Sequence, residues 1–491
     1  MTSPAHYAID WLPWTDSAFA RAGAERKPIL LSIVTAWSRG CEEMDRTSYA
    51  DPAVTALVAD RFVPVRVDAD RRPDISNRYT LGGWPTTAFL SASGAILGGG
   101  TFVAADRLPS VLRRVVDAFE SVPAPGERDA PWPADEPLGR QPVVPVETLE
   151  RNVFESFDRV SGAFGGLPRF PHAAPVHLAL LHARSDADSS YADIATTCLD
   201  AMGWGALYDE VDGGFFRCAE GSDWARPRSE KLLDVNASLL TLYVDGFETL
   251  RLARYAERAD HLLGFLQHTL ADVQDGGWAS SQQEDPDYYA IDEPRARAAR
   301  AAPRVDRTLF SAPNALMVSA ALRAGGVMED DSLRTFALKS LERVLLRHYR
   351  PGAGIAHCIS DGQEIRGLLD DQIAMGTALL DAYDLTGDIV YEMMAKEVAH
   401  QAVIACRDER GGGFFDRAMG PHDIGLLRRP LKPMVANCEA ARMLRRLALT
   451  SNDADFAALA DEALRAAAAQ AASQGVLAAH YVLAVREAQL R

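Results

Sequence analysis

The first part of the chain alternates short apolar runs with stretches of helical spacing. The runs at 29–34, 62–67 and 86–91 are rich in valine, isoleucine, leucine and threonine, which is typical of buried strands. Apolar positions at 40–60 and 106–120 recur every three or four residues, as on one face of a helix. Strands separated by helical segments predict an α/β domain.

Proline interrupts this pattern after residue 121. Prolines recur through the segment 122–145 at positions 123, 125, 131, 133, 137, 142 and 145. Such a density excludes regular secondary structure and predicts a linker. We therefore expect an α/β domain over 1–121, a proline-rich linker over 122–145 and a separate region over 146–491.

The region after residue 146 has the pattern of paired helices. Leu239, Tyr243, Phe247 and Leu250 share one face of a helix, and a second helix follows after a short link. The longer links contain glycine-rich turns followed by apolar residues, at 165–166, 213–216, 276–278, 352–355 and 411–415. Helical hairpins with alternating short and long links predict a closed (α/α)6 toroid, whose long loops form the mouth of a pocket. A generic helical array with glycine turns is the alternative.

The composition of the chain indicates which binding partners and which cellular compartment to expect. The chain has 491 residues and a net charge of −17, which disfavours nucleic acid and anionic membrane as partners. Without a long apolar stretch or a signal-like start, a cytoplasmic protein is expected. The six cysteines include no C-x-x-C pair, so we expect neither a disulfide framework nor a metal site, in agreement with a reducing compartment.

Polar residues gather where the long loops enter the next helix. Among them, Glu230, Asp234, Asp370 and Asp371 are the catalytic candidates, because paired carboxylates can divide the roles of general acid and general base. That chemistry suits glycoside cleavage or proton abstraction beside a carbonyl. Aspartate and asparagine are also the commonest helix N-caps, so each residue has a structural alternative.

Other residues of the same loops and helix starts are candidates for binding the substrate. Aromatic side chains offer flat faces for a sugar ring, and arginine and lysine suit an anionic substrate such as a sugar phosphate or uronate. The candidates are Asp212, Phe216, Arg217, Trp224, Arg228, Lys231, Asn236, Asn314, His357, Asp416, Arg429 and Asn437.

Ser-Arg-Gly-Cys at 38–41 follows the first apolar run, where a thioredoxin-like domain carries its Cys-x-x-Cys motif. Pro85, in Gly-Gly-Trp-Pro, stands where the cis-proline strand of that fold would lie. Disulfide exchange needs an attacking thiolate and a resolving cysteine. Because Ser38 cannot supply a thiolate, Ser38, Cys41 and Pro85 are interpreted as the remnant of a redox site, and a dithiol oxidoreductase is not expected.

Motifs along nearly the whole chain carry a family resemblance. They include Lys27-Pro28-Ile29, Gly83-Trp84-Pro85, Pro168-Arg169-Phe170-Pro171, Gly213-Gly214-Phe215, Glu230-Lys231 with Asn236, Leu369-Asp370-Asp371 and Gly412-Gly413-Phe414-Phe415-Asp416. With these motifs the chain resembles the thioredoxin-domain-containing proteins related to spermatogenesis-associated protein 20. The resemblance implies a thioredoxin-like domain joined to an (α/α)6 barrel similar to N-acylglucosamine 2-epimerases and six-hairpin glycosidases.

The chain also departs from that family. Ser38 and Cys41 occupy the two cysteine positions of the family motif, and Phe216 and Arg228 occupy two positions where the family usually has histidine. A tryptophan before Asn314 is replaced by Pro313. The chain is therefore identified as a divergent member, and the loss of both histidines disfavours an epimerase of the two-histidine type.

The leading hypothesis is a barrel enzyme that acts on a carbohydrate or similar polar metabolite, by isomerase, epimerase or hydrolase acid–base chemistry. It predicts a small-molecule ligand in the barrel mouth and no cofactor. One alternative is a non-catalytic module that binds a ligand, or a protein partner at the thioredoxin-like domain. Another is a thiol function of Cys41: a helix start can lower the pKa of its thiol, although the nearby Glu42, Glu43 and Asp45 oppose that lowering. A new reaction in a specialised biosynthetic pathway is the third.

Overall fold

The computed structural model describes residues 8–121, 143–184, 190–360 and 362–490. These residues fall into two compact units. The first comprises 8–121 together with 419–430, and the second contains the remaining described residues. Most of the predicted linker, positions 122–142, lies outside the described residues.

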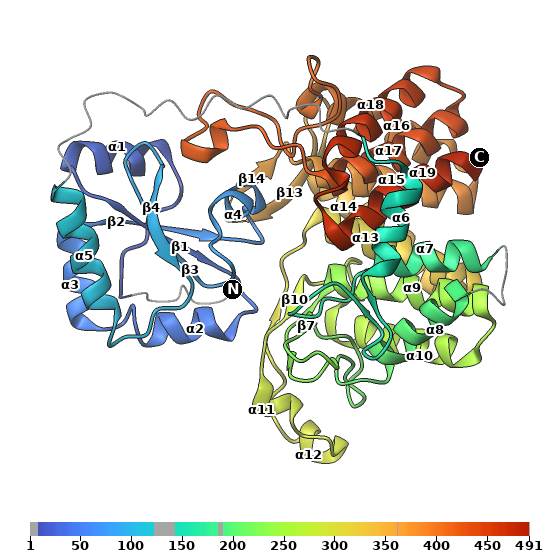
Figure 1. The fold of residues 1–491 in the computed structure, drawn as a ribbon, viewed down its shortest axis with the longest axis horizontal. Coiled ribbons are helices and arrows are strands. Elements are labelled where there is room, and N and C mark those ends of the chain that lie inside the picture. Colours follow the sequence, from blue (N-terminus) through green and yellow to red (C-terminus); the bar gives the residue numbers. More distant parts are fainter. Residues whose placement is uncertain (1–7, 122–142, 185–189, 361, 491) are drawn as a thin grey trace. The chain divides into compact units, whose positions relative to one another are not determined.

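The first unit is built on a four-stranded sheet in the order β2–β1–β3–β4 (Figure 1). β1 (Ile29–Val34) pairs in parallel with β2 (Val63–Asp68) and antiparallel with β3 (Thr86–Leu90), which pairs antiparallel with β4 (Ile96–Gly100). The α/β prediction is confirmed. β4 was not predicted, because its sequence Ile-Leu-Gly-Gly-Gly offers few side chains that could mark a strand pattern.

Helices cover both faces of this sheet. The predicted helix over 40–60 is two helices, because the Asp51 carboxylate accepts hydrogen bonds from the N–H groups of Ala53 and Val54, at 2.7 and 3.2 Å, and so starts a new helix at Pro52. The helices are α1 (Asp16–Glu25), α2 (Arg39–Arg46), α3 (Pro52–Arg61), α4 (Pro73–Tyr79) and α5 (Leu108–Ser121).

Strand alternation divides the core of this unit into two layers. Leu31 of β1 packs in one cluster with α1 and α4, and Leu30 packs in another with α3 and α5. The first cluster also contains Ile424 and Leu427, which come from the far end of the sequence. The segment 419–430 is therefore part of the core of the first unit.

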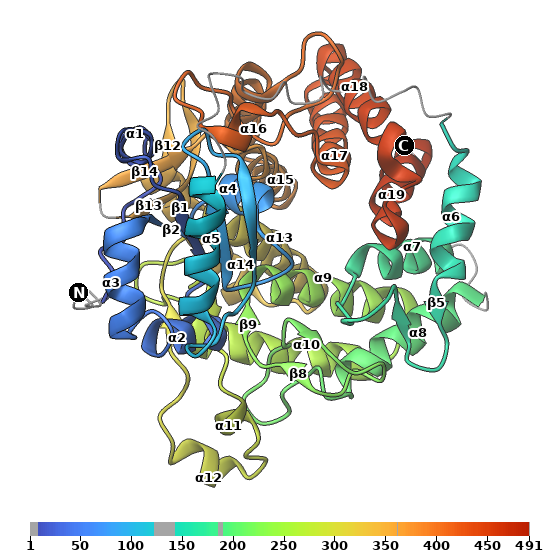
Figure 2. The ribbon, with the colours of Figure 1, turned by 60° about the vertical axis from the view of Figure 1, so that its left-hand side comes forward.

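The second unit is an (α/α)6 toroid, as predicted. Each inner helix packs against the next, and the last packs back against the first to close the ring (Figure 2). The inner helices are α7 (Ala173–Ala183), α9 (Leu233–Leu250), α13 (Ser311–Val327), α15 (Leu369–Thr386), α17 (Met434–Ser451) and α19 (Ala478–Leu490).

An outer helix pairs with each inner helix. The seam of the ring joins the two ends of this region: the Arg486 guanidinium of α19 donates to the buried Glu150 carboxylate of α6 at 2.9 Å, and His182 of α7 contacts the same carboxylate. The outer helices are α6 (Val146–Glu155), α8 (Ser190–Gly203), α10 (Ala253–Phe265), α14 (Asp331–His348), α16 (Ile389–Cys406) and α18 (Ala454–Ala471).

The links from each outer helix to the next inner helix lie at one end of the toroid, and all of them except 472–477 are long. They contain the short strands and extra turns of the unit, and the N-terminus of every inner helix points to this end. The elements are β5 (Phe157–Asp158), β6 (Ala163–Phe164), β7 (Cys218–Ala219), β8 (Pro227–Arg228), β9 (Lys231–Leu232), η1 (Leu266–Leu270), β10 (Ser281–Gln282), α11 (Pro286–Tyr289), α12 (Pro294–Ala298), β11 (Val305–Asp306), β12 (Tyr349–Arg350), β13 (Gly354–Ser360), β14 (Gln363–Arg366), η2 (Gly425–Arg428, in the first unit) and η3 (Gly475–Leu477).

Candidate functional site

Amide side chains in the first turns of inner helices hold the glycine-rich loops. The Asn236 amide accepts from the N–H of Phe215 at 2.7 Å and donates to the C=O of the same residue at 3.0 Å. The same arrangement joins Asn314 to Trp278, Gln372 to Ile355 and Asn437 to Phe414. Each amide is buried, and its oxygen and nitrogen are used by the backbone. We predicted that Asn236, Asn314 and Asn437 bind substrate; the structure instead uses them to fasten loop to helix.

Glu230 and Arg217 form an ion pair on the loop before α9. The guanidinium of Arg217 donates to the Glu230 carboxylate, and the Arg217 N–H donates to the Glu230 C=O at 3.0 Å. Glu230 is 1% exposed, and its second carboxylate oxygen has no partner among the described residues. Burial raises the pKa of Glu230. The positive charge of Arg217 lowers this pKa, but by less than burial raises it.

Asp234 lies in the first turn of α9 and has a different environment. Its side chain is exposed, yet the surrounding protein desolvates the carboxyl and raises its pKa. Its carboxylate accepts a hydrogen bond from the N–H of Val235 at 2.8 Å. The Asp234 carboxyl is therefore accessible to solvent and also partly desolvated.

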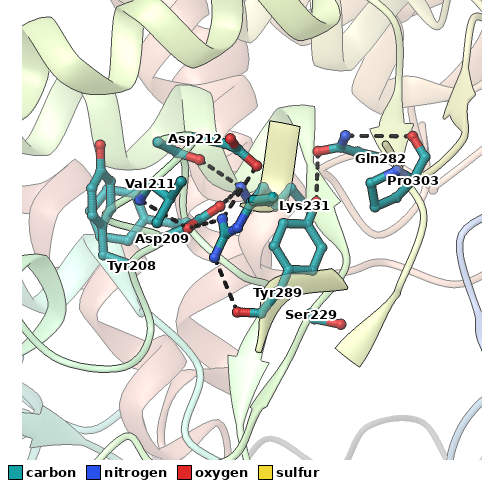
Figure 3. A network of polar contacts seen from close by, with 12 residues as sticks. Tyr208, Asp209, Val211, Asp212, Ser229, Lys231, Gln282, Tyr289 and Pro303 are labelled. Carbon is teal, nitrogen blue, oxygen red and sulfur yellow. Dashed lines mark hydrogen bonds and ion pairs between the residues drawn. The ribbon is translucent and has the colours of Figure 1, made fainter. Parts of the chain in front are cut away.

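Lys231 lies at the centre of a buried network of charged and aromatic side chains (Figure 3). Its ammonium donates to the Asp209 carboxylate at 2.7 Å and lies 4.7 and 4.6 Å from the ring centres of Phe265 and Tyr289. The side chain is fully buried, and this desolvation lowers the pKa of Lys231 to about 8 although Asp209 opposes the change. We predicted that Lys231 contacts substrate; the structure instead encloses it.

Arg297 ties the arm formed by α11 and α12 to the same network. Its guanidinium donates to Asp209 at 2.6 Å and to Asp212 at 3.3 Å, and also to the C=O of Tyr289 at 3.1 Å. Tyr289 in turn donates to the side-chain oxygen of Gln282 at 2.7 Å (Figure 3). Asp212, a predicted substrate ligand, therefore serves to anchor the arm.

Phe216 and Trp224 are buried rather than presented to a ligand. Phe216 packs edge-on against Tyr289 with ring centres 5.0 Å apart. The Trp224 indole N–H donates to the C=O of Ser161 at 2.9 Å. Both aromatic side chains therefore stabilise the loops and are not open faces for a sugar.

Two arginines that were predicted to bind substrate, Arg228 and Arg429, instead contact other residues of the protein. Arg228 is half exposed and pairs with Glu220 at 2.8 Å and with Glu284 at 3.6 Å. Arg429 belongs to the segment 419–430, and its C=O accepts a hydrogen bond from Arg78 at 2.9 Å. Arg429 is thus part of the first unit and not of the barrel that we predicted it to serve.

Asp370 stands in the first turn of α15 with its side chain exposed. Desolvation by the surrounding protein, together with the negative charges of Asp371 and Asp416, raises the pKa of Asp370 to about 6. An accessible carboxylic acid that titrates near neutral pH is suited to donate a proton. This is the clearest chemical feature of the loop end.

Asp371 and His357 form a buried pair next to it. Both carboxylate oxygens of Asp371 lie 3.0 Å from Nδ1 of His357, and one accepts from the N–H of Ala312 at 3.0 Å. Asp371 is 0% exposed, and the imidazole packs against Phe310 with ring centres 5.0 Å apart. The structure thus brings together two predicted site residues, and Asp371 fixes the orientation of the imidazole.

Asp416 joins this group through its backbone and its charge. Its C=O accepts from the N–H of Leu369, the residue before Asp370, at 2.9 Å, and its N–H donates to the C=O of Leu431 at 2.8 Å. Its negative charge contributes to the raised pKa of Asp370. The predicted residues Asp370, Asp371, His357 and Asp416 therefore form one cluster.

Charged residues in the middle of α17 and α19 were not predicted. Nδ1 of His480 lies 2.9 Å from the Glu439 carboxylate, and Arg442 donates to Glu439 at 2.7 Å and to Glu487 at 2.8 Å. Although burial favours the neutral acid, Arg442 and His480 lower the pKa of Glu439 to about 2. Glu439, Arg442 and Glu487 line a cavity of about 160 Å³ with Arg446. The three- and four-residue spacing of Glu439, Arg442 and Arg446 along α17 was the signal that could have identified them.

The predicted redox remnant lies in the first unit. Ser38 immediately precedes α2 and Cys41 is within its first turn, while the Trp84–Pro85 peptide bond is cis. Cys41 is 4% exposed, and burial raises the pKa of its thiol. A helix start can lower the pKa of a thiol, which was the basis of the alternative thiol function, but here desolvation of the thiolate raises the pKa.

The described part of the chain shows neither a metal-binding group nor a membrane-spanning helix. Its histidine, cysteine, aspartate and glutamate side chains include no group of three or more arranged to hold a metal ion. In the same ranges, none of the helices combines the length and the apolar character that a membrane span requires.

Comparison with known sequences confirms the resemblance that the motifs predicted. Residues 1–124 match the family model Thioredox_DsbH, described as a protein of unknown function, DUF255. The chain is 28% identical over 313 residues to spermatogenesis-associated protein 20 of Mus musculus, covering 57% of this chain and 39% of that protein. It is 28% identical over 309 residues to the uncharacterized protein B0495.5 of Caenorhabditis elegans, covering 57% and 42%. The matches thus span about two-fifths of these relatives.

Solved structures share the fold of the toroid. Cellobiose 2-epimerase from Bacillus thermoamylovorans B4167 superposes with a TM-score of 0.52 at 12% identity, covering 65% of this chain and 86% of that one. A D-mannose isomerase gives 0.52 at 11%, covering 65% and 85%. The GH76 α-mannanase of Bacteroides thetaiotaomicron gives 0.51 at 11%, covering 71% and 97%. At such identities the likeness concerns the fold alone.

Proposed function

We propose that the toroid binds a neutral saccharide at its loop end and cleaves a glycosidic bond, with Asp370 as the proton donor. The observation that carries the proposal is the environment of Asp370, whose accessible carboxyl has its pKa raised to about 6 by desolvation and by two neighbouring carboxylates. Such an acid retains a proton close to neutral pH and can give it to a departing oxygen.

The cleavage is completed by a water molecule that bonds to the anomeric carbon, and a carboxylate that stays ionised must accept the proton of this water. Glu439 meets this need, because Arg442 and His480 hold its pKa at about 2 despite its burial. Its charge contributes to the raised pKa of Asp370, so the two groups lie within electrostatic reach of each other. A pair of carboxyl groups with separated pKa values supports a division into acid and base.

The charges of the toroid favour a neutral ligand over an anionic one. Each predicted binding cation of the toroid already has a carboxylate partner, and an anionic ligand would have to displace it at a cost in desolvation and lost pairing. The same holds for the arginines deeper in the ring. The pairs are Arg217–Glu230, Lys231–Asp209, Arg228–Glu220, Lys432–Asp408, Arg442–Glu487 and Arg446–Asp384. We therefore replace the expected sugar phosphate or uronate by an uncharged sugar.

The structural neighbours support the substrate class and the reaction. Their names connect them with cellobiose, mannose and mannan. One neighbour, an α-1,6-mannanase from Salegentibacter sp. HEL1_6, is described as inactive after two consecutive aspartates were replaced by alanine (TM-score 0.50, 14% identity). Asp370 and Asp371 are likewise consecutive. Because Phe216 and Arg228 replace the family histidines, carboxyl groups are the remaining acid–base candidates, which favours hydrolysis over two-histidine epimerisation.

A ligand panel with a product assay tests the proposal. We expect a neutral disaccharide or oligosaccharide to raise the melting temperature, since a ligand at 100 times its Kd adds about 2.7 kcal/mol to the free energy of unfolding. Matched hexose phosphates and uronates should give no shift. The wild type should release reducing ends from the bound saccharide, whereas Asp370→Asn should bind it and release none. The proposal would be contradicted if no neutral saccharide raised the melting temperature, or if only the anionic sugars raised it.

A further inference from the structure

The loop between α16 and α17 begins and ends in the toroid. Its neck is closed by the hydrogen bond from the N–H of Asp416 to the C=O of Leu431 at 2.8 Å. The N–H of Ala418 donates to the C=O of Gly367 at 2.7 Å, and the C=O of Asp416 accepts from Leu369 at 2.9 Å. The neck is thus bonded to the residues that lead into Asp370.

The tip of this loop, residues 419–430, folds with the first unit. The hydroxyl of Tyr79, at the end of α4, accepts from the N–H of Leu426 at 2.8 Å and donates to the C=O of Gly94 at 2.8 Å. The Arg78 guanidinium donates to the C=O of Leu426 at 3.0 Å and to the C=O of Arg429 at 2.9 Å. Two consecutive residues of α4 therefore bind the backbone of the tip.

The tip packs closely against the first unit at Gly425. A Cβ atom added at Gly425 would lie 2.2 Å from the Tyr79 hydroxyl and 3.0 Å from Cα of Gly94. Ile424 and Leu427 are buried in the same cluster as Ile75 and Tyr79. The tip is therefore a fixed part of the first unit, although 347 residues separate Tyr79 from Leu426.

We infer that the thioredoxin-like unit is the anchor of this loop and thereby keeps Asp416 beside Asp370. The chain passes between the two units at 418–419 and at 430–431, by a single peptide bond each time, so that fixing the tip restrains the neck. This role uses Tyr79 and Arg78 and needs neither a second cysteine nor a reactive thiol. It concerns the protein without any ligand and does not depend on the proposed function.

Hydrogen exchange measured by mass spectrometry on the full chain tests this inference. Tyr79→Phe removes the hydroxyl that holds Leu426 and keeps the buried ring. We expect the amides at 366–370 and 411–418 to exchange about fivefold faster, as for the loss of one hydrogen bond. Tyr49→Phe is the matched control, because Tyr49 is a buried tyrosine of the same unit whose hydroxyl lies 3.3 Å from Thr87. It should leave the neck at the wild-type rate.

Gly425→Ala provides a second variant, because its added Cβ must displace the tip from Tyr79. It should accelerate exchange in the same neck peptides while the strands of the first unit stay protected. Faster exchange confined to 419–430, with 366–370 unchanged in both variants, would show that the tip is only a tether and would overturn the inference. An equal acceleration in Tyr49→Phe would also overturn it, since the effect would then reflect general loss of stability.

Discussion

Asp370 and Asp371 are consecutive residues of α15, yet one carboxyl group is exposed and the other is fully buried against His357. Helix geometry separates them, because successive side chains point about 100° apart around the axis. The same acidic pair therefore serves two purposes, which single substitutions can separate.

Asp370→Asn is expected to reduce turnover by about 10²- to 10⁴-fold, the range contributed by a positioned proton donor. Saccharide binding should persist, because the amide resembles the protonated acid in shape and charge. Initial rates of reducing-end release and a binding isotherm measure the two effects. Asp331→Asn, at the exposed first residue of α14, is the control and should leave the rate unchanged. Equal rates for wild type and Asp370→Asn would remove Asp370 from the chemistry.

The pH dependence of stability follows from the raised pKa of Asp370. The native state holds this proton up to about pH 6, whereas the unfolded chain releases it near 4, so the native state binds more protons between these values. Stability from this group therefore falls as pH rises through that window and stays lower above it. Asp370→Asn should melt at a higher temperature than wild type at pH 7.5 and at the same temperature below pH 4. A lower melting temperature for the variant at pH 7.5 would contradict the raised pKa.

Asp371→Ala is expected to lower the free energy of unfolding and not only the catalytic rate. The change removes the acceptor of the Ala312 N–H and the carboxylate that contacts Nδ1 of His357, and each buried hydrogen bond lost in this way costs about 1–3 kcal/mol. Urea unfolding measures the loss. Asp370→Ala is the matched comparison, since its exposed side chain satisfies no such groups. A similar loss of stability for both variants would show that burial does not distinguish the two residues.

Asn314→Ala tests the structural role assigned to the amide residues. It removes the partner of the N–H and the C=O of Trp278, and we expect a loss of about 2–4 kcal/mol in the free energy of unfolding. Asn152→Ala, at an exposed position of α6, should change stability by less than about 0.5 kcal/mol. Loss of saccharide binding at full stability in Asn314→Ala would instead restore the predicted role in substrate contact.

Cys41 is expected to react slowly with thiol reagents. Its burial raises the thiol pKa, so little thiolate is present at pH 8 and the reagent has little access. Iodoacetamide labelling followed by mass spectrometry of the Cys41 peptide measures the rate. A cysteine introduced by Ala20→Cys, at an exposed position of α1, serves as the reference thiol in the same protein. If Cys41 were labelled as fast as this reference thiol, the hypothesis of a thiol function would be supported.

The spacing of apolar residues in short segments predicted most of the strands and helices. The strand predicted over 29–34 is β1, and the paired helices after residue 146 close into the predicted toroid. The break at Asp51 and Pro52 was readable in principle, because a capping aspartate followed by proline starts a helix. β4 could not be read, because its three glycines leave little pattern.

The candidate site was less predictable than the fold. Polar residues at helix starts were recognised, but spacing alone did not distinguish Asp370, whose side chain is exposed, from Asn314, which binds the backbone of a loop. Lys231 and Arg217 were expected to contact the ligand. In the structure each forms an ion pair within the protein instead, Lys231 with Asp209 and Arg217 with Glu230. Glu439 was not predicted, because it lies within α17 and not in a loop or at the start of a helix.

By itself the sequence determined the order of strands and helices, the division into an α/β part and a toroid, and the absence of a Cys-x-x-Cys pair. These properties depend on composition and on periods of two and 3.6 residues, which short segments contain in full. Only the tertiary structure decided which carboxyl groups stay accessible, which cations are neutralised and where residues 419–430 fold. Those outcomes depend on burial and on partners far apart in the sequence, such as Tyr79 and Leu426, and no local pattern records them.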